Sequence, residues 1–147
     1  MTIYRERLWA SAWVYLALAL VIPASLLVFW PISVLAGVIV AIVLYAGCVG
    51  IVIAASPSIV VTDSQLIAGR ARLPLGLVGT VEKFQEPEAT LQRGQRLDAR
   101  AWLLIRGWIG PVVKVEVLDP ADPTPYWLVS TRHPDALAGA LTGVRPA

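Results

Sequence analysis

The feature that most constrains this chain is a long stretch without a charged side chain. Residues 8–62 contain no Asp, Glu, Lys or Arg. As one helix, this stretch would be about 82 Å long at roughly 1.5 Å per residue, whereas the hydrocarbon core of a bilayer is about 30 Å thick. The whole composition agrees, because 57% of the 147 residues are hydrophobic and only 15% are charged. The stretch therefore predicts two membrane spans joined by a tight turn.

The two spans are expected at about 8–30 and 32–55. Pro31 separates them. Proline is tolerated in the first turn of a helix, because the backbone N–H groups of that turn have no acceptor within the helix. Small residues four apart in the second span, Gly37 with Ala41 and Ala46 with Gly50, allow close approach of helices. We expect this packing within the hairpin; a homo-oligomer contact stays open as the alternative.

Arginines flank the pair of spans on both sides. Arg5 and Arg7 precede it, Arg70 and Arg72 follow it, and the turn between the spans is uncharged. Positive charge is retained on the cytoplasmic side of membranes, so both termini are expected in the cytoplasm. A cleaved signal peptide is the alternative. The apolar run of a signal peptide is shorter than the first span of this chain and is followed by a cleavage site of small residues, which is not evident here.

From Pro57 onward the pattern changes to short alternating runs, which are typical of β-strands. The expected helix is 134–142, with Pro134 at its start and Asp135 in its first turn. The expected strands are 58–62, 65–69, 77–84, 101–109, 112–118 and 126–131, with 89–94 as a weaker candidate.

The sequence thus predicts an α+β membrane protein, with a transmembrane helical hairpin at 1–56 and a small β-sandwich or barrel with a C-terminal helix at 57–147. The order of elements in the second part resembles a pleckstrin-homology-like (PH-like) domain. A narrower resemblance rests on three segments, DPADPTPYWLVSTRHPDALAGAL (119–141), ARAWLLIRGW (99–108) and GRARLPL (69–75). They resemble an actinobacterial family of two-span membrane proteins of unknown function, which implies an architecture and no activity.

Two sets of residues are candidates for binding. Arginines close to the spans can contact anionic lipid headgroups, each contributing about 1 kcal/mol near a charged surface; these are Arg5, Arg7, Arg70 and Arg72. Aromatic and arginine side chains often anchor protein partners; the candidates are Trp102, Arg106, Trp108, Tyr126 and Trp127. A second basic series, Arg93, Arg96, Arg100 and Arg106, is expected on a solvated face.

Catalytic, metal and cofactor sites are not expected. His133 is the only histidine, and the only cysteine, Cys48, lies within the second span, so the ligand count for a structural metal is not met. The glycines fit no phosphate-binding motif. A formal charge of +2 is too small to indicate a nucleic-acid partner.

These observations favour a non-catalytic interaction or scaffold module at the inner face of a bacterial plasma membrane, with a bound protein partner. Recognition of anionic lipid headgroups by the PH-like domain is the alternative function. An enzyme built on His133, Ser130 and Asp135 is less favoured, because acid–base catalysis needs positioned partners and the sequence shows none around His133. An oligomeric pore is less favoured, because no charged group lies within the spans.

Overall fold

The computed structural model describes residues 1–143 and divides the chain into two compact units. One contains Met1–Leu8 and the chain from Pro57 onward; the other contains Trp9–Ser56. The predicted order of two apolar helices, a β part and a C-terminal helix is confirmed. The boundary differs from the predicted one, because the first eight residues belong to the β unit and not to the hairpin.

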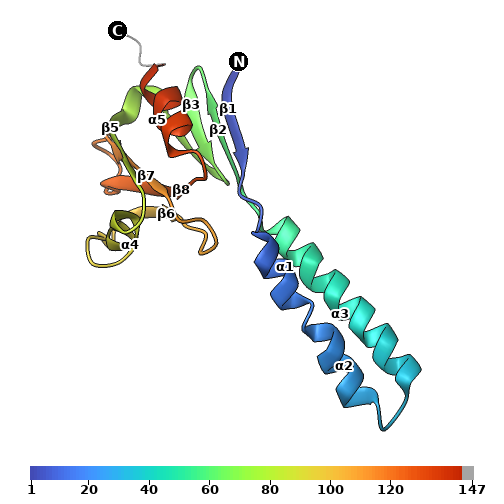
Figure 1. Cartoon of the computed structure of the whole chain (residues 1–147). Helices are drawn as coiled ribbons and strands as arrows, with labels where there is room; N and C mark the ends of the chain where they lie inside the picture. Colours follow the sequence, from blue (N-terminus) through green and yellow to red (C-terminus); the bar gives the residue numbers. More distant parts are fainter. Residues whose placement is uncertain (144–147) are drawn as a thin grey trace. The chain divides into compact units, whose positions relative to one another are not determined.

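The apolar unit is a helical hairpin (Figure 1), but its first arm is broken. That arm consists of α1 (Ala12–Leu18) and α2 (Val21–Phe29). Pro23 has no N–H to offer the carbonyl of Ala19, and this carbonyl accepts instead from the N–H of Ile22, at 3.0 Å. A proline inside a helical segment removes one hydrogen bond and crowds the preceding turn. The first span is therefore two short helices over 12–29, where a continuous helix over 8–30 was expected.

The second arm, α3 (Val34–Ala54), begins at Ser33 rather than at Pro31. Ser33 Oγ accepts a hydrogen bond from the N–H of Ala36, at 3.3 Å, and so caps the helix. Gly37 and Ala41 are buried against the first arm. A Cβ on Gly37 would lie 3.2 Å from the Cβ of Phe29, so close packing of these two small residues within the hairpin is confirmed.

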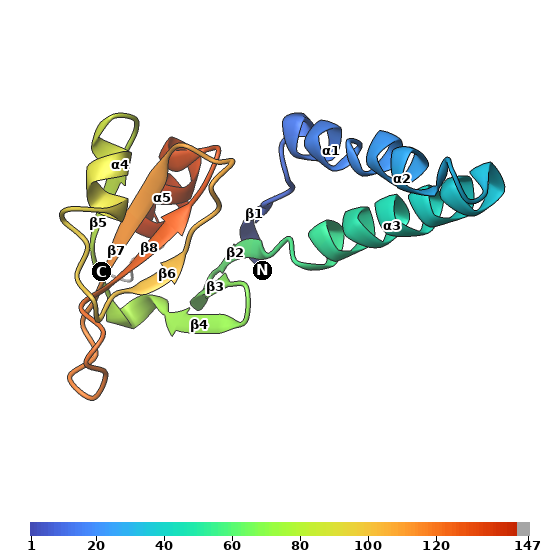
Figure 2. The ribbon, with the colours of Figure 1, turned by 90° about the horizontal axis from the view of Figure 1, so that it is seen from below.

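The β unit contains two four-stranded sheets (Figures 1 and 2). Sheet 1 has the order β1 (Thr2–Arg7), β2 (Ser58–Thr62), β3 (Gln65–Ala68) and β4 (Ala71–Pro74), all antiparallel. Sheet 2 has the order β5 (Val78–Phe84), β7 (Val112–Val117), β8 (Tyr126–Ser130) and β6 (Trp102–Leu104). In sheet 2 only β6 runs parallel to its neighbour. A 3-10 turn, η1 (Leu75–Leu77), joins the sheets.

Four elements of the β unit differ from the sequence prediction, and one of them is β4, since no strand was expected at 71–74. Strand β1 was not expected, because its partner β2 lies beyond the whole hairpin in sequence. Residues 89–94 form a helix, α4 (Glu88–Arg93), and not a strand; Ala89 and Gln92 lie three apart and are its buried residues. The expected strand 101–109 shortens to β6.

Side chains of the central strand β8 alternate between two hydrophobic clusters. Trp127 and Val129 lie in the larger cluster, whereas Tyr126 and Leu128 lie in the smaller one. This alternation agrees with the predicted faces. The C-terminal helix α5 (Pro134–Gly143) buries Leu137 and Leu141 in the larger cluster and contacts β5 and β7 of sheet 2 and β1 and β2 of sheet 1. It therefore holds the two sheets together.

Candidate functional site

The outer face of sheet 1 brings together arginines from both sides of the hairpin. Arg5 on β1 pairs with Val60 on β2, Val60 pairs with Ile67 on β3, and Ile67 pairs with Arg72 on β4. Directly paired residues point to the same face of a sheet. Two candidate arginines therefore flank two half-buried aliphatic side chains in one row; both arginines are exposed.

Arg7 and Arg70 lie at one end of this row. Arg7 is two residues beyond Arg5 on β1, so it shares the outer face, and it pairs with Ser58. Arg70 is in the turn between β3 and β4, next to Gly69, whose positive φ of 62° favours glycine. The N–H of Gly69 donates to the carbonyl of Ser58, at 2.8 Å. We call Arg5, Arg7, Arg70 and Arg72 the arginine face.

The arginine face has little negative charge beside it. The four strands of sheet 1 contain one acidic residue, Glu6, which is buried on the opposite face. Within residues 1–143, no ion pair involves Arg5, Arg70 or Arg72. The arrangement can therefore attract anions.

Glu6 is the polar residue that sequence reasoning missed. Its carboxylate accepts hydrogen bonds from the hydroxyls of Tyr4, at 2.7 Å, and Thr131, and from the N–H of Arg132, at 2.9 Å. These contacts tie β1 to the segment between β8 and α5. Burial, together with the neighbouring carboxylate, raises the pKa of Tyr4 to about 12. The sequence signal for this site was the alternation of residues along 4–8, which places Tyr4, Glu6 and Leu8 on one face of a strand.

The second basic series is largely paired within its own segment. Arg96 pairs with Glu88, at 2.8 Å, and Arg100 with Asp98, at 2.9 Å. Hydrogen bonds from Arg100 lower the pKa of Asp98 to about 2. The prediction of a solvated face fits these exposed pairs.

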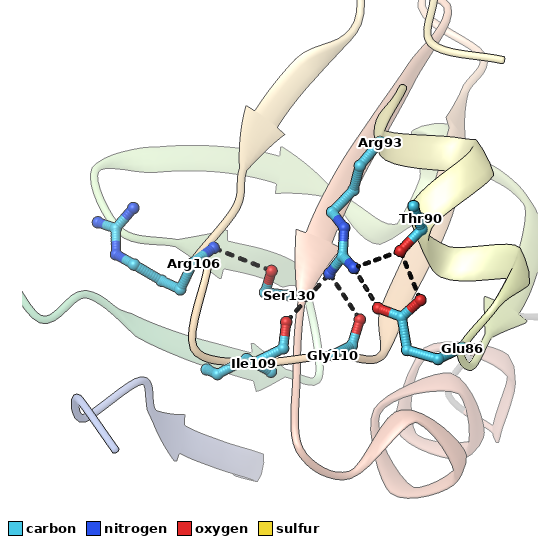
Figure 3. A network of polar contacts seen from close by, with 7 residues as sticks. All are labelled: Glu86, Thr90, Arg93, Arg106, Ile109, Gly110 and Ser130. Carbon is cyan, nitrogen blue, oxygen red and sulfur yellow. Dashed lines mark hydrogen bonds and ion pairs between the residues drawn. The ribbon is translucent and has the colours of Figure 1, made fainter. Parts of the chain in front are cut away.

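Arg93 is different, because its guanidinium reaches into the fold (Figure 3). It donates to the carbonyls of Ile109, at 3.1 Å, and Gly110, at 2.7 Å. It also pairs with Glu86 and donates to Thr90 Oγ1. Arg93 therefore fastens α4 to the loop that precedes β7.

Most of the aromatic candidates for partner contact are structural. Trp127 is buried and lies against the Trp102 ring, with centroids 4.5 Å apart. Tyr126 is also buried, and its hydroxyl accepts from the N–H of Asp98, at 2.8 Å. Both were proposed as partner contacts, and burial removes them from that role. Trp102 and Trp108 are partly buried and pack against the core.

The remaining candidate, Arg106, lies half-buried in the segment after β6. Its N–H donates to Ser130 Oγ, at 3.0 Å (Figure 3). Its guanidinium donates to the carbonyl of Ile105, at 2.8 Å. Both contacts hold the local backbone.

Of the side chains considered for catalysis, those of Ser130 and Asp135 have structural contacts, whereas His133 is exposed and is held through its backbone. Ser130 is fully buried, and Thr131 is held by Glu6. Asp135 pairs with Lys83, and the N–H of His133 donates to Thr131 Oγ1, at 3.0 Å. Among residues 1–143 no group of three His, Cys, Asp or Glu side chains is arranged to hold a metal ion.

Two open hollows lie on the outer side of sheet 2, with volumes of about 420 and 370 Å³. They share Thr80 and Glu116. The carboxylate of Glu116 accepts from the N–H of Thr80, at 2.8 Å, which lowers the pKa of Glu116. This contact fills an irregularity of β5, and a Cβ on Gly79 would lie 2.5 Å from Glu116 Oε2. The carboxylate of Glu116 therefore has a structural partner within sheet 2.

Comparison with known proteins bears on the whole chain. A family model described as "Protein of unknown function (DUF3093)" matches residues 3–141. The chain belongs to the DUF3093 family. The matched range includes β1, the apolar helices and the β unit through Leu141, so DUF3093 describes both units together. Comparison with the curated proteins and with the solved structures gave no significant match.

The DUF3093 match confirms the predicted membership of a family of unknown function. It covers the segments on which the resemblance rested, including the proline-rich loop at 119–125. In that loop Asp119 accepts from the N–H of Ala121 and Asp122 from the N–H of Thr124, both at 2.9 Å. Such local bonds stiffen a turn, so the loop has a structural role in this chain.

Proposed function

We propose that this DUF3093 chain is a non-catalytic interaction or scaffold module, anchored in the plasma membrane of an actinobacterium with its β unit in the cytoplasm. The observation that carries the proposal is the pairing of β1 with β2. The first precedes the apolar helices and the second follows them. Paired strands share one aqueous compartment, so both ends of the helical hairpin lie on the same side of the membrane.

The surface of the hairpin supports the anchor. The segments Ala12–Phe29 and Val34–Ala54 are 18 and 21 residues long and strongly apolar, which matches the length needed to cross a bilayer. Their buried residues are few, namely Ser25, Gly37 and Ala41. A helix in the core of a soluble protein would be mostly buried, and an exposed apolar surface of this extent is typical of a membrane segment.

The two rival explanations of the apolar helices are less well supported. A cleaved signal sequence would take β1 with it, and the β unit would lose both an edge strand and the buried carboxylate of Glu6. Leu16, Leu27 and Leu35 are 74, 76 and 70% exposed. A helix in the core of a soluble protein would bury such side chains. The anchor agrees with all of these observations.

The arginines favour the cytoplasmic side. Arg5 and Arg7 lie before the hairpin and Arg70 and Arg72 after it, whereas the turn between α2 and α3 has no charge. This asymmetry corresponds to the positive-inside rule.

We propose a PH-like class for the β unit. Its two sheets and the helix α5, which contacts both, support this class. The parallel pairing of β6 with β8 is a departure from a simple antiparallel order. Because the serine candidate, Ser130, is fully buried and accepts a hydrogen bond from the N–H of Arg106, the unit is expected to act through its surface.

The orientation can be tested with single cysteines in a Cys48→Ser background. We expect Ile32→Cys, in the turn between α2 and α3, to react with a membrane-impermeant maleimide in intact cells or spheroplasts. Thr2→Cys and Gln85→Cys, both exposed in the β unit, should react only after the membrane is opened. Labelling of Gln85→Cys from outside would contradict the cytoplasmic placement.

The interaction role can be tested by comparing membrane complexes. We expect native complexes purified from cells with and without this chain to differ in composition, and the tagged chain to retain a stoichiometric protein partner in mild detergent. Trp102→Ala and Trp108→Ala should be compared with the wild type, because these side chains are only partly buried. Identical complex profiles, with no co-purifying partner, would count against a scaffold role.

A further inference from the structure

On the arginine face, Arg5, Arg70 and Arg72 have no ion pair within residues 1–143. We infer that this face docks on the anionic phospholipid headgroups of the membrane that holds the hairpin. The inference rests on the proposed function, since it assumes that the helices are in a bilayer, and it assigns a lipid partner to a surface of the β unit.

Charge supports this occupant. Arg5, Arg70 and Arg72 are exposed and have no ion-pair partner within residues 1–143. Elsewhere in the β unit, exposed arginines such as Arg96 and Arg100 are paired with acids. An unpaired arginine is attracted by the negative surface potential of the cytoplasmic leaflet.

Covalent connections keep the face near the bilayer. Arg7 is five positions before the first residue of α1, and Ser58 is four positions after the last residue of α3. An extended chain spans at most about 3.5 Å per residue. The near end of sheet 1 is therefore held within roughly 17 Å of the helix ends, whereas lipid charge acts over a Debye length of about 8–10 Å. A small approach of the sheet suffices for contact.

The spacing of the charges suits a surface rather than a single phosphate. Arg5 and Arg72 are on the two edge strands, which are three strand spacings apart, or about 14 Å. Between them lie Val60 and Ile67, which offer no hydrogen-bond donor to a headgroup. The two arginines are thus placed to contact separate headgroups, and docking should follow the density of anionic lipid rather than the identity of the headgroup.

Docking can be measured by energy transfer in the full-length chain. A donor dye is placed on Gln65→Cys in a Cys48→Ser background, and the chain is reconstituted in nanodiscs that contain an acceptor lipid. Gln65 is on the outer side of β3, at the opposite end of this strand from Gly69, which lies beside Ser58, the first residue of β2. A dye there approaches lipid when the face docks. The matched control is Gln85→Cys, an exposed glutamine that follows β5 in sheet 2.

We expect transfer from the Gln65→Cys dye to be higher with phosphatidylglycerol than with phosphatidylcholine alone, and to fall as salt is added. Transfer from the Gln85→Cys dye should not rise. Each arginine near an anionic surface changes binding by about fivefold, so Arg5→Gln with Arg72→Gln should reduce the ratio of docked to undocked chain by at least tenfold. Arg96→Gln with Arg100→Gln removes the same charge outside the face and should leave docking unchanged.

The other outcomes overturn the inference in separable ways. If the chain is retained in nanodiscs but transfer is the same with and without phosphatidylglycerol, lipid docking is excluded and the membrane anchor stands; an acidic protein partner would give this result. If only one anionic headgroup supports transfer at equal charge, docking by charge density is wrong. If the full-length chain is not retained in the bilayer, the proposed function and the inference both fail.

Discussion

Replacement of Glu6 by alanine is expected to lower the free energy of unfolding of the β unit by about 3 kcal/mol. The substitution leaves the buried hydroxyl of Thr131, the partly buried hydroxyl of Tyr4 and the N–H of Arg132 without their shared acceptor. A buried polar group that loses its partner costs about 1–3 kcal/mol, and bonds to a charged acceptor are the stronger ones. The free energy of unfolding is measured by denaturant titration of the full-length chain in detergent. Hydrogen exchange of the backbone amides of β8 reports the progress of unfolding.

Two further variants separate this contact from a general effect of charge. Glu6→Gln keeps one acceptor oxygen and should be intermediate, because its amide group cannot accept from the N–H of Arg132 as well. Glu82→Ala removes an exposed carboxylate that is 3.9 Å from Lys114, and such pairs contribute at most about 1 kcal/mol. If Glu6→Ala and Glu82→Ala changed stability equally, the buried network would not be what holds β1.

Replacement of Arg93 by alanine is expected to cost about 2 kcal/mol, mainly through loosening of α4. The guanidinium satisfies the carbonyls of Ile109 and Gly110 and the side chains of Glu86 and Thr90 (Figure 3). Ile109 is only 2% exposed, so water does not readily replace the lost donor. Hydrogen exchange of the amides of α4 should increase more than that of β7.

The planar geometry of the guanidinium gives the control for this prediction. Arg93→Lys keeps the charge but cannot donate to several acceptors in one plane, so it should recover only part of the stability. Arg96→Ala, which breaks an exposed pair with Glu88, should change stability by less than about 1 kcal/mol. Full rescue by lysine would mean that charge alone, and not the shape of the donor group, fastens α4.

The Glu6 contact also concerns one of the two chain connections between the β unit and the hairpin. The Glu6 network holds β1, the strand that leads directly into the apolar helices. If β1 detached, the hairpin would remain connected to the β unit only through β2, and Arg5 and Arg7 would leave the arginine face. Glu6→Ala is thus expected to weaken lipid docking as well, although Glu6 itself lies on the opposite side of the sheet.

Local signals in the sequence were sufficient for several elements. The break before Ser58 and the helix start at Pro134 follow from the chemistry of single residues, and the structure agrees. The segment 89–94 was read as a strand, because its few residues carry too little periodicity. Its helix depends on burial of Ala89 and Gln92, which only the folded chain supplies.

The apolar stretch by itself determined that two apolar helical arms precede the β part, because backbone N–H and C=O groups in apolar surroundings must pair within their own segment. The flanking arginines were also visible in the sequence, as two pairs about sixty residues apart. Only the tertiary structure decided that they share one face of one sheet. The reason is that strand pairing is non-local: β1 is too short to be stable alone, and its position depends on β2 and on a buried carboxylate whose partners lie more than 120 residues away.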